Sequence, residues 1–248
     1  MSLRETEGYI LSTMPHGDTS KIIRVFTREY GRISLIAKGV KKAKSKSGGA
    51  LDTLNLLKIV YYYKESRELQ LLSKFEIIDI YPSVKGDLNK LALGIAVLET
   101  VINLIVEEEQ NEDLFQLIKK VLDSLDKADR NFFNIYWYFL FRFLKLSGYE
   151  IVFDSCRSCG KQTGNSARLF SYQVGGIICE DCTDVQGTIG ISAETLQVMR
   201  SVQSKKTENL LNLSVSDLTV KEINGILSKY YTYHFDGYRP PESLKLIM

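Results

Sequence analysis

The chain has 248 residues, of which 44% are hydrophobic and 25% charged, and its formal net charge is +2. This composition is typical of a globular protein with one large domain or two smaller ones. The sequence contains no run of about 18 apolar residues that could span a bilayer, and its first residues lack the pattern of a secretion signal. We therefore expect a cytoplasmic protein with no membrane partner.

The positive charge is concentrated at one end of the chain. Residues 1–50 contain ten Lys or Arg and four Asp or Glu, a net charge of +6, so the remaining residues carry −4. Such asymmetry indicates a polyanionic partner for the N-terminal segment. A solvated lysine-rich loop is the alternative interpretation.

Five short runs rich in Ile, Val, Tyr, Phe and Thr favour β-strands in the first third of the chain. They cover residues 8–14, 20–27, 32–39, 54–63 and 69–79. Residues 29–31, which include Gly31, and residues 64–68 are suited to hairpin turns. Five antiparallel strands of this length predict a small closed barrel, either an OB fold or an SH3-like barrel.

Apolar residues at three- and four-residue spacing predict helices after residue 81. The expected helices cover 87–110, 113–127 and 130–147, and two more begin at Ser192 and Ser216. Asp87 and Asp113 are suited to helix starts, and Gly148 to a helix end. The fold class is therefore α+β, with an OB-fold barrel at 1–80 and a helical domain at 81–248 that contains a loop-rich cysteine segment.

Four cysteines form the most specific local pattern. They are Cys156, Cys159, Cys179 and Cys182, two Cys-x-x-Cys pairs separated by nineteen residues. Each pair can present two thiolates to one ion, so we expect Zn²⁺ to be bound at about 154–184. Disulfides and redox catalysis are the alternatives. Four thiolates leave no open position for water, so the expected zinc is structural rather than catalytic.

Basic residues on the second and third strands and the loop that follows are the predicted nucleic-acid contacts. They are Lys21, Arg24, Arg28, Arg32, Lys38, Lys41, Lys42, Lys44 and Lys46. If about five of them neutralise single-strand phosphates, the log-log salt slope of binding is roughly −3.5. Tyr9, Phe26, Tyr30 and residues 61–63 supply aromatic rings for base stacking, although barrel core is the favoured interpretation for any one of them.

No motif of a known catalytic machinery is present. The sequence lacks a P-loop, a Gly-x-Gly-x-x-Gly run and a Gly-x-Ser-x-Gly run. The two histidines, His16 and His234, are interpreted as structural or surface residues. We therefore expect a binding protein rather than an enzyme.

Two blocks of sequence resemble the bacterial recombination mediator family RecO. The first runs from His16-Gly17-Asp18 through 26–31 to Ala37-Lys38-Gly39 and the lysines that follow. The second joins residues 141–149 to Cys156-Arg157-Ser158-Cys159-Gly160 and to the glycines before Cys179. Ile151 and Glu242 depart from the family's pattern, and the second departure puts a contact by the C-terminal tail in doubt.

The resemblance implies an OB-fold, a helical domain with an embedded zinc motif, and binding of single- and double-stranded DNA. It also implies annealing of complementary strands without ATP and loading of recombinase onto strands coated by single-strand-binding protein (SSB). The implied partners are RecR, the C-terminal tail of SSB and, indirectly, the RecA recombinase. An RNA-binding protein with a zinc ribbon and a scaffold for an acidic protein are the rival hypotheses.

Overall fold

The computed structural model describes residues 2–40, 49–105, 110–164, 169–182 and 184–248. The chain forms two compact units, residues 1–119 and 120–248, and each is considered by itself. The domain boundary expected near residue 80 stays a prediction.

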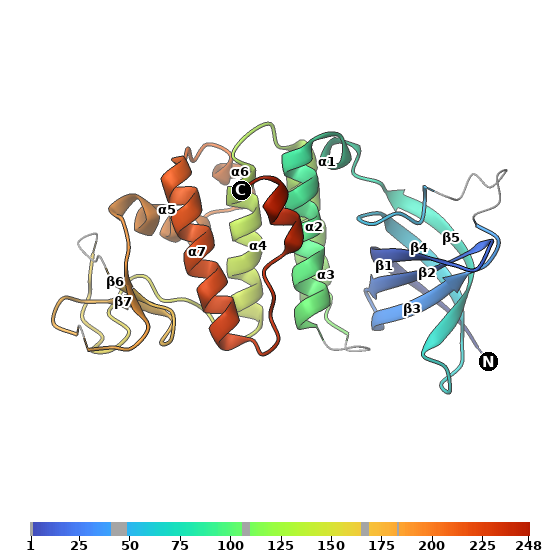
Figure 1. The fold of residues 1–248 in the computed structure, drawn as a ribbon, viewed down its shortest axis with the longest axis horizontal. Helices are drawn as coiled ribbons and strands as arrows, with labels where there is room; N and C mark the ends of the chain where they lie inside the picture. The colour runs from blue at the N-terminus through green and yellow to red at the C-terminus, as the bar shows by residue number, and fades with distance from the viewer. Residues whose placement is uncertain (1, 41–48, 106–109, 165–168, 183) are drawn as a thin grey trace. The chain divides into compact units, whose positions relative to one another are not determined.

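The first unit contains a closed five-stranded barrel (Figure 1). Its strands are β1 (Ser2–His16), β2 (Ser20–Thr27), β3 (Gly31–Ala37), β4 (Leu56–Tyr63) and β5 (Leu69–Asp79). The order around the barrel is β1-β2-β3-β5-β4, and β1 pairs with β4 to close it. All neighbours are antiparallel except β3 and β5, which pair in parallel over only three residues. This is the Greek-key order of an OB fold, so the predicted fold class is confirmed.

Alternation along the strands produces the barrel core. Ile23, Val25, Leu35 and Ile59 are buried in its interior, and residues between them face outward. Gly8 on β1 permits close approach of β2, because a Cβ there would lie 2.4 Å from a methyl carbon of Val25. The strand boundaries expected from the sequence are correct for β2 and β5, whereas β1 begins earlier and extends further than its apolar run.

Helices follow the barrel in the first unit. They are α1 (Pro82–Gly86), which the periodicity did not predict, and α2 (Leu88–Leu104). The side chain of Asp87 caps α2 by accepting a hydrogen bond from the backbone N–H of Lys90, as expected. The next helix, α3 (Glu112–Lys127), has Asp113 in its first turn, and Asn111 accepts from the N–H of Leu114. The prediction of a helix that continues to residue 110 is wrong, because α2 ends at Leu104 and Ile105 is extended, with φ of −98° and ψ of 126°. Residues 106–109 lie outside the described part.

The second unit is mainly helical. It contains the end of α3 together with α4 (Phe132–Leu146), α5 (Ala193–Ser204), α6 (Thr207–Leu210), α7 (Asp217–His234) and the short 3₁₀ helix η1 (Glu242–Leu246). Trp137 of α4 is fully buried and donates its indole N–H to Asn224 of α7 over 2.7 Å. Tyr231 is also fully buried and donates to the carbonyl of Leu140. Gly148, with φ of 80°, follows the end of α4 as predicted.

Helices α5 and α7 cap each other. Ser192 and Ser216 are their N-caps, which confirms both predicted helix starts. Glu222 of α7 accepts hydrogen bonds from the backbone N–H and hydroxyl of Ser192, each at 2.8 Å. Glu194 of α5 accepts the corresponding pair from Ser216, at 3.1 and 2.9 Å. Each carboxylate therefore accepts hydrogen bonds from the N-cap serine of the other helix.

The cysteine segment is more ordered than the expected loop. Three short strands, β6 (Leu169–Ser171), β7 (Gly176–Ile178) and β8 (Thr188–Gly190), pair in the order β7-β6-β8. Runs of three residues are too short for an alternating pattern to be recognised in the sequence. Among the residues described, no helix is both long and apolar enough to cross a bilayer.

Candidate metal centre and nucleic-acid interface

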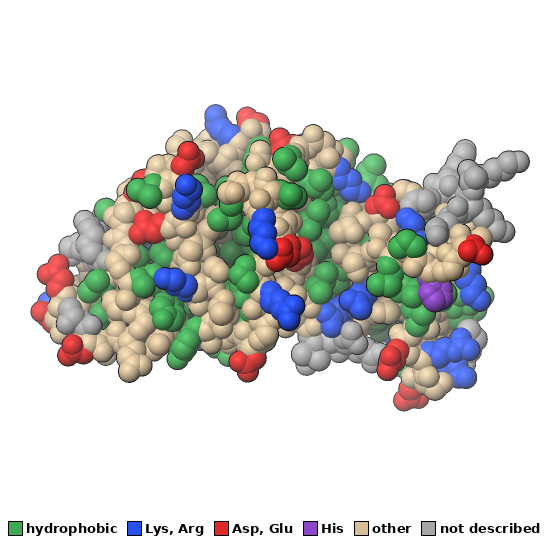
Figure 2. Space-filling model, viewed as in Figure 1, with side chains coloured by type: hydrophobic (Ala, Val, Ile, Leu, Met, Phe, Trp, Pro, Cys, Tyr) green, Lys and Arg blue, Asp and Glu red, His purple; other side chains and the backbone are tan. Residues whose placement is uncertain are grey.

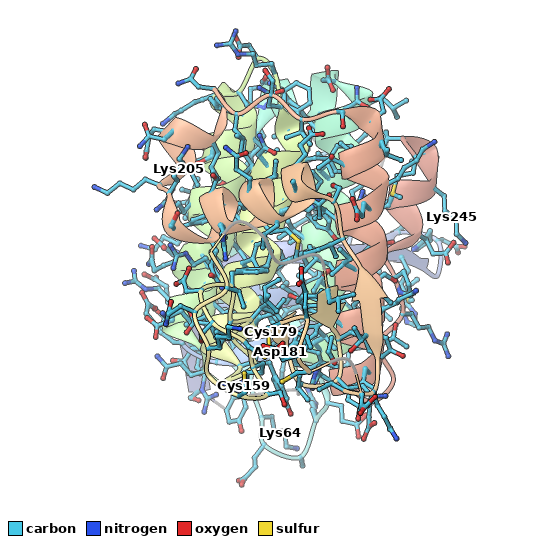
Figure 3. All side chains as sticks on the ribbon, turned by 90° about the vertical axis from the view of Figure 1, so that its left-hand side faces the viewer. Lys64, Cys159, Cys179, Asp181, Lys205 and Lys245 are labelled. Atoms are coloured by element: carbon cyan, nitrogen blue, oxygen red, sulfur yellow. The ribbon has the colours of Figure 1, made fainter. Side chains whose placement is uncertain are left out.

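The four cysteine sulfurs form one cluster in the second unit. All four Sγ atoms lie within 4.8 Å of one another, and those of Cys159 and Cys179 are 3.6 Å apart. Figure 3 shows these two side chains close together, with Asp181 beside them. Ligands at about 2.3 Å from a tetrahedral ion lie about 3.8 Å from one another, so the cluster has the size required to hold a metal ion.

Local backbone contacts build the two cysteine turns. The N–H of Gly160 donates to the carbonyl of Cys156, and the N–H of Cys182 donates to that of Cys179. Gly160 has φ of 77°, a conformation that favours glycine. A Cβ on Gly176 would lie 2.6 Å from the carbonyl oxygen of Val152, so only glycine fits there. Glycine is therefore required at both positions by the backbone around the cysteines.

Ionisation of the thiols is uneven. Burial opposes the thiolate of Cys156, but N–H donors in the two cysteine turns outweigh it and lower its pKa to about 6. The neighbouring thiol of Cys179 raises the pKa of Cys182 to about 12. Four crowded sulfurs therefore resist full ionisation unless a cation is present. This donor set fits a soft or borderline metal ion with no ligand position left for water.

The surface around the cysteines is not strongly basic. Lys161 pairs with Asp181 at 2.8 Å, and Arg157 donates to the carbonyl of Val174. Asp154, Glu180 and Asp184 add further negative charge, while Arg168 lies outside the described residues. A cluster of thiolates adds to that charge, so this end of the unit is poorly suited to phosphate.

The predicted DNA-binding residues fall into three groups. Lys21 pairs with Asp52, Arg28 with Glu112 and Glu7, and Arg32 donates to the carbonyl of Ile102. Arg24 and Lys38 are exposed, and no contact of either is recorded with a carboxylate of the described chain. Lys41, Lys42, Lys44 and Lys46 lie outside the described residues. Over the barrel, Figure 2 shows Lys and Arg side chains interspersed with Asp and Glu.

The ion pair between Arg28 and Glu112 links β2–β3 turn residues to the start of α3. The two side chains approach to 2.9 Å, and Arg28 lowers the pKa of the Glu112 carboxyl. Arg28 therefore has an internal partner for its charge, unlike Arg24.

The aromatic residues also divide into core and surface. Tyr9, Phe26 and Tyr61 are almost fully buried, and the rings of Tyr9 and Phe26 pack on Phe115. Tyr61 belongs to the barrel core, as that interpretation expects, whereas Tyr9 and Phe26 are buried on the outer face of the barrel against α3. Tyr30 is partly exposed, as are Tyr62 and Tyr63.

Arg4 is a cation that the sequence analysis did not select. Its guanidinium carbon lies 3.4 Å from the ring centroid of Tyr63 and 4.6 Å from that of Tyr30. The three residues line a cavity of about 450 Å³ together with Arg24 and Arg32. Arg4 is isolated in the sequence, and the pairing of β1 with β4 brings it to Tyr63, while Tyr30 comes from the turn between β2 and β3.

The fold and the cysteine cluster define an α+β protein that combines an OB-fold barrel with a potential four-sulfur metal site. Family models for the N-terminal and C-terminal parts of recombination protein O match residues 1–81 and 85–243. The chain therefore belongs to the RecO family. This membership supports a role in DNA repair and recombination.

Individual relatives extend over most of the chain. The DNA repair protein RecO of Alkaliphilus metalliredigens is 28% identical over 235 residues, 94% of each chain. The RecO protein of Caldanaerobacter subterraneus is 25% identical over 95% of this chain and 94% of its own. That of Desulfatibacillum aliphaticivorans is 33% identical over 183 residues, 71% of this chain and 70% of its own.

Proposed function

We propose that this protein is a recombination mediator that binds single- and double-stranded DNA and anneals complementary strands without ATP. It also helps to load recombinase onto DNA coated by SSB. Membership of the RecO family over nearly the whole chain carries this proposal. Its partners are RecR, the C-terminal tail of SSB and, indirectly, the RecA recombinase. The protein acts in the cytoplasm at the nucleoid and catalyses no reaction.

Annealing by such a protein has a simple physical basis. Cations that screen the phosphates of two strands lower their repulsion, and base pairing then supplies the free energy. Arg24, Lys38 and the loop lysines at 41, 42, 44 and 46 are the DNA contacts in this proposal. Lys21, Arg28 and Arg32 contribute less, because each already has an internal partner.

The cysteine cluster is proposed to bind Zn²⁺ through Cys156, Cys159, Cys179 and Cys182. When bound, the ion supplies a four-sulfur cross-link between the two cysteine turns. Its role is structural, because the donor set leaves no position for a reacting water. The site therefore supports the fold of the second unit rather than DNA chemistry.

The function is tested by annealing two labelled complementary oligonucleotides without ATP over a salt series. We expect the wild type to accelerate annealing and a Lys41, Lys42, Lys44 and Lys46 to Ala variant to lose most of the acceleration. Arg24→Gln should reduce the salt slope of single-strand binding by about 0.7, the contribution of one phosphate contact. Arg28→Gln is the matched control and should leave the slope nearly unchanged.

The same measurements would also support one of the two rival hypotheses if the mediator proposal is wrong. Preference for structured RNA over single-stranded DNA would support the RNA-binding alternative. Absence of annealing and of single-strand binding at low salt would contradict the mediator proposal and favour a scaffold for an acidic protein.

A further inference from the structure

The four cysteines of the cluster differ in their access to solvent. Cys159 is exposed, whereas Cys156 and Cys179 are buried, with 1% and 7% of their surface exposed, and Cys182 is intermediate. Oxidation of thiols depends on the access of the oxidant to the sulfur. A reagent from solution therefore meets Cys159 more readily than the other three cysteines.

The sulfur of Cys179 is a close neighbour of the exposed one. The two Sγ atoms are 3.6 Å apart, and Figure 3 shows both side chains at the same end of the second unit. A disulfide requires the sulfurs to approach to about 2.05 Å, which small side-chain rotations can provide from this distance. Cys159 and Cys179 belong to different cysteine turns, so a bond between them would join the two turns.

Cys156 is less suited to react with Cys159. Its sulfur accepts a hydrogen bond from the backbone N–H of Cys179 at 3.4 Å, and its own N–H donates to the carbonyl of Lys161 at 2.8 Å. These contacts and its burial fix the position of Cys156. Of the two buried cysteines, Cys179 is therefore the better partner for an oxidised Cys159.

Backbone contacts bring the two turns together before any bond between sulfurs forms. The N–H of Arg157 donates to the carbonyl of Ile177 at 2.8 Å, and the N–H of Ile177 donates to the carbonyl of Val152 at 3.0 Å. The N–H of Val152 in turn donates to the carbonyl of Gly175 at 3.0 Å. These hydrogen bonds connect the first turn and the residues before it to β7, which leads directly into the second turn.

We propose that Cys159 is an oxidation site for peroxides and that Cys179 reacts with the oxidised sulfur to form a disulfide between the two turns. The two remaining thiolates, Cys156 and Cys182, then no longer complete a four-sulfur site. Oxidation thus exchanges a metal cross-link for a covalent one. The proposal rests on the metal binding proposed above and is independent of DNA binding.

The reaction balances with a peroxide as the only oxidant. The Cys159 thiolate attacks one oxygen of hydrogen peroxide and breaks the O–O bond, which gives a sulfenic acid and a hydroxide that takes up a proton. The Cys179 thiolate then attacks the Cys159 sulfur, and a second hydroxide leaves and takes up a proton. Two thiolates lose two electrons in total, and the peroxide becomes two water molecules. A thiol reductant reverses the change by thiol–disulfide exchange.

The test uses the full chain, loaded with Zn²⁺ under reducing conditions and then freed of excess metal and reductant. Hydrogen peroxide should cause the loss of about one zinc ion per chain, measured with a chromogenic chelator. Free thiols are then alkylated, and the chain is cut with trypsin and endoproteinase Glu-C. Cleavage after Arg157 and Glu180 places each cysteine on a different peptide. Mass spectrometry should find residues 158–161 joined to residues 169–180.

Cys159→Ser and Cys182→Ser form a matched pair, because each removes one sulfur from the cluster. Both are compared in the metal-free form with thermal melting as the check on folding. Peroxide should produce the Cys159–Cys179 disulfide in Cys182→Ser. In Cys159→Ser the remaining thiols should be oxidised several-fold more slowly, since the exposed sulfur is absent.

Two results would contradict the proposal. One is a disulfide within a turn, between Cys156 and Cys159 or between Cys179 and Cys182, in place of the bond between the turns. The other is equal oxidation rates in the two serine variants. If the wild type binds no Zn²⁺, the proposed cofactor is wrong, and the peptide map of the metal-free chain still decides whether Cys159 and Cys179 join.

Discussion

The barrel and the cysteine-containing unit are held together in different ways. In the barrel, every strand pairs with two neighbours, and alternate side chains fill one continuous apolar interior. In the second unit, the helices pack through a buried core that includes Trp137, Phe139 and Tyr231, whereas the strands at the cysteines have only three residues each. Removal of one group from the barrel leaves many parallel contacts, whereas in the cysteine segment the four sulfurs provide most of the connection between the two turns.

This difference determines how far the loss of stability caused by a substitution should extend. A sheet closed on itself distributes stability over its hydrogen bonds and core, while a metal cluster or a shared cap concentrates it on one atom set. Substitutions at the cysteines and at the caps of α5 and α7 should therefore produce effects confined to the second unit, with the largest at the cysteines.

The largest effect is expected from loss of a cysteine ligand. Cys156→Ser, or removal of the proposed metal ion with a chelator, should destabilise the β6–β7 pair and the two cysteine turns by on the order of 4 kcal/mol, because the turns would lose the proposed cross-link. Hydrogen exchange should show faster exchange of the amides in β6 and β7. Amides of β2 and β3 should keep their protection.

Lys161→Ala is the control for that measurement. Its ion pair with Asp181 is exposed, so loss of the pair should change exchange very little. If Cys156→Ser also leaves β6 and β7 protected, the cluster does not hold this segment together and the contrast between the units is wrong.

The sequence predicts the barrel well because its signal is repeated along each strand. Five runs rich in β-branched and aromatic residues are sufficient to indicate the strands, and β2 and β5 agree to the residue. The cysteine pairs are predicted equally well, since their spacing alone brings two sulfurs together. β6 to β8 and α1 were missed because runs of three to five residues contain too little periodicity to recognise.

The sequence says less about which Lys and Arg side chains of the barrel pair with carboxylates. Lys21, Arg24, Arg28 and Arg32 look equivalent in the sequence, but only the fold shows that Arg28 meets Glu112 and Lys21 meets Asp52. The sequence analysis did not select Arg4 because its neighbours are distant in the sequence. Its role depends on Tyr30 and Tyr63, which become its neighbours only when the barrel closes.

An intermediate effect is expected at Glu222. Glu222→Ala removes the acceptor for the backbone N–H and hydroxyl of Ser192, so the start of α5 loses its partner. Hydrogen bonds to a charged group contribute about 1.5–3 kcal/mol, and we expect a loss of that order in denaturant unfolding of the second unit. Lys221→Ala, an exposed neighbour on the same helix, is the control. Equal effects of the two substitutions would show that the reciprocal cap is not a stabilising link.

The smallest effect is expected at Glu194, and its pH dependence identifies the cause. Hydrogen bonds from the backbone N–H and hydroxyl of Ser216 lower the pKa of Glu194. Because the folded state has the lower pKa, this carboxylate stabilises the protein above its unfolded pKa of about 4.3, and the contribution is lost as the pH falls through the folded pKa. Glu194→Gln should therefore lower the melting temperature slightly at pH 7 but not below the folded pKa. A difference that persists in acid would mean that Glu194 acts through packing or neutral hydrogen bonds, and the cap on α7 would then not depend on its charge.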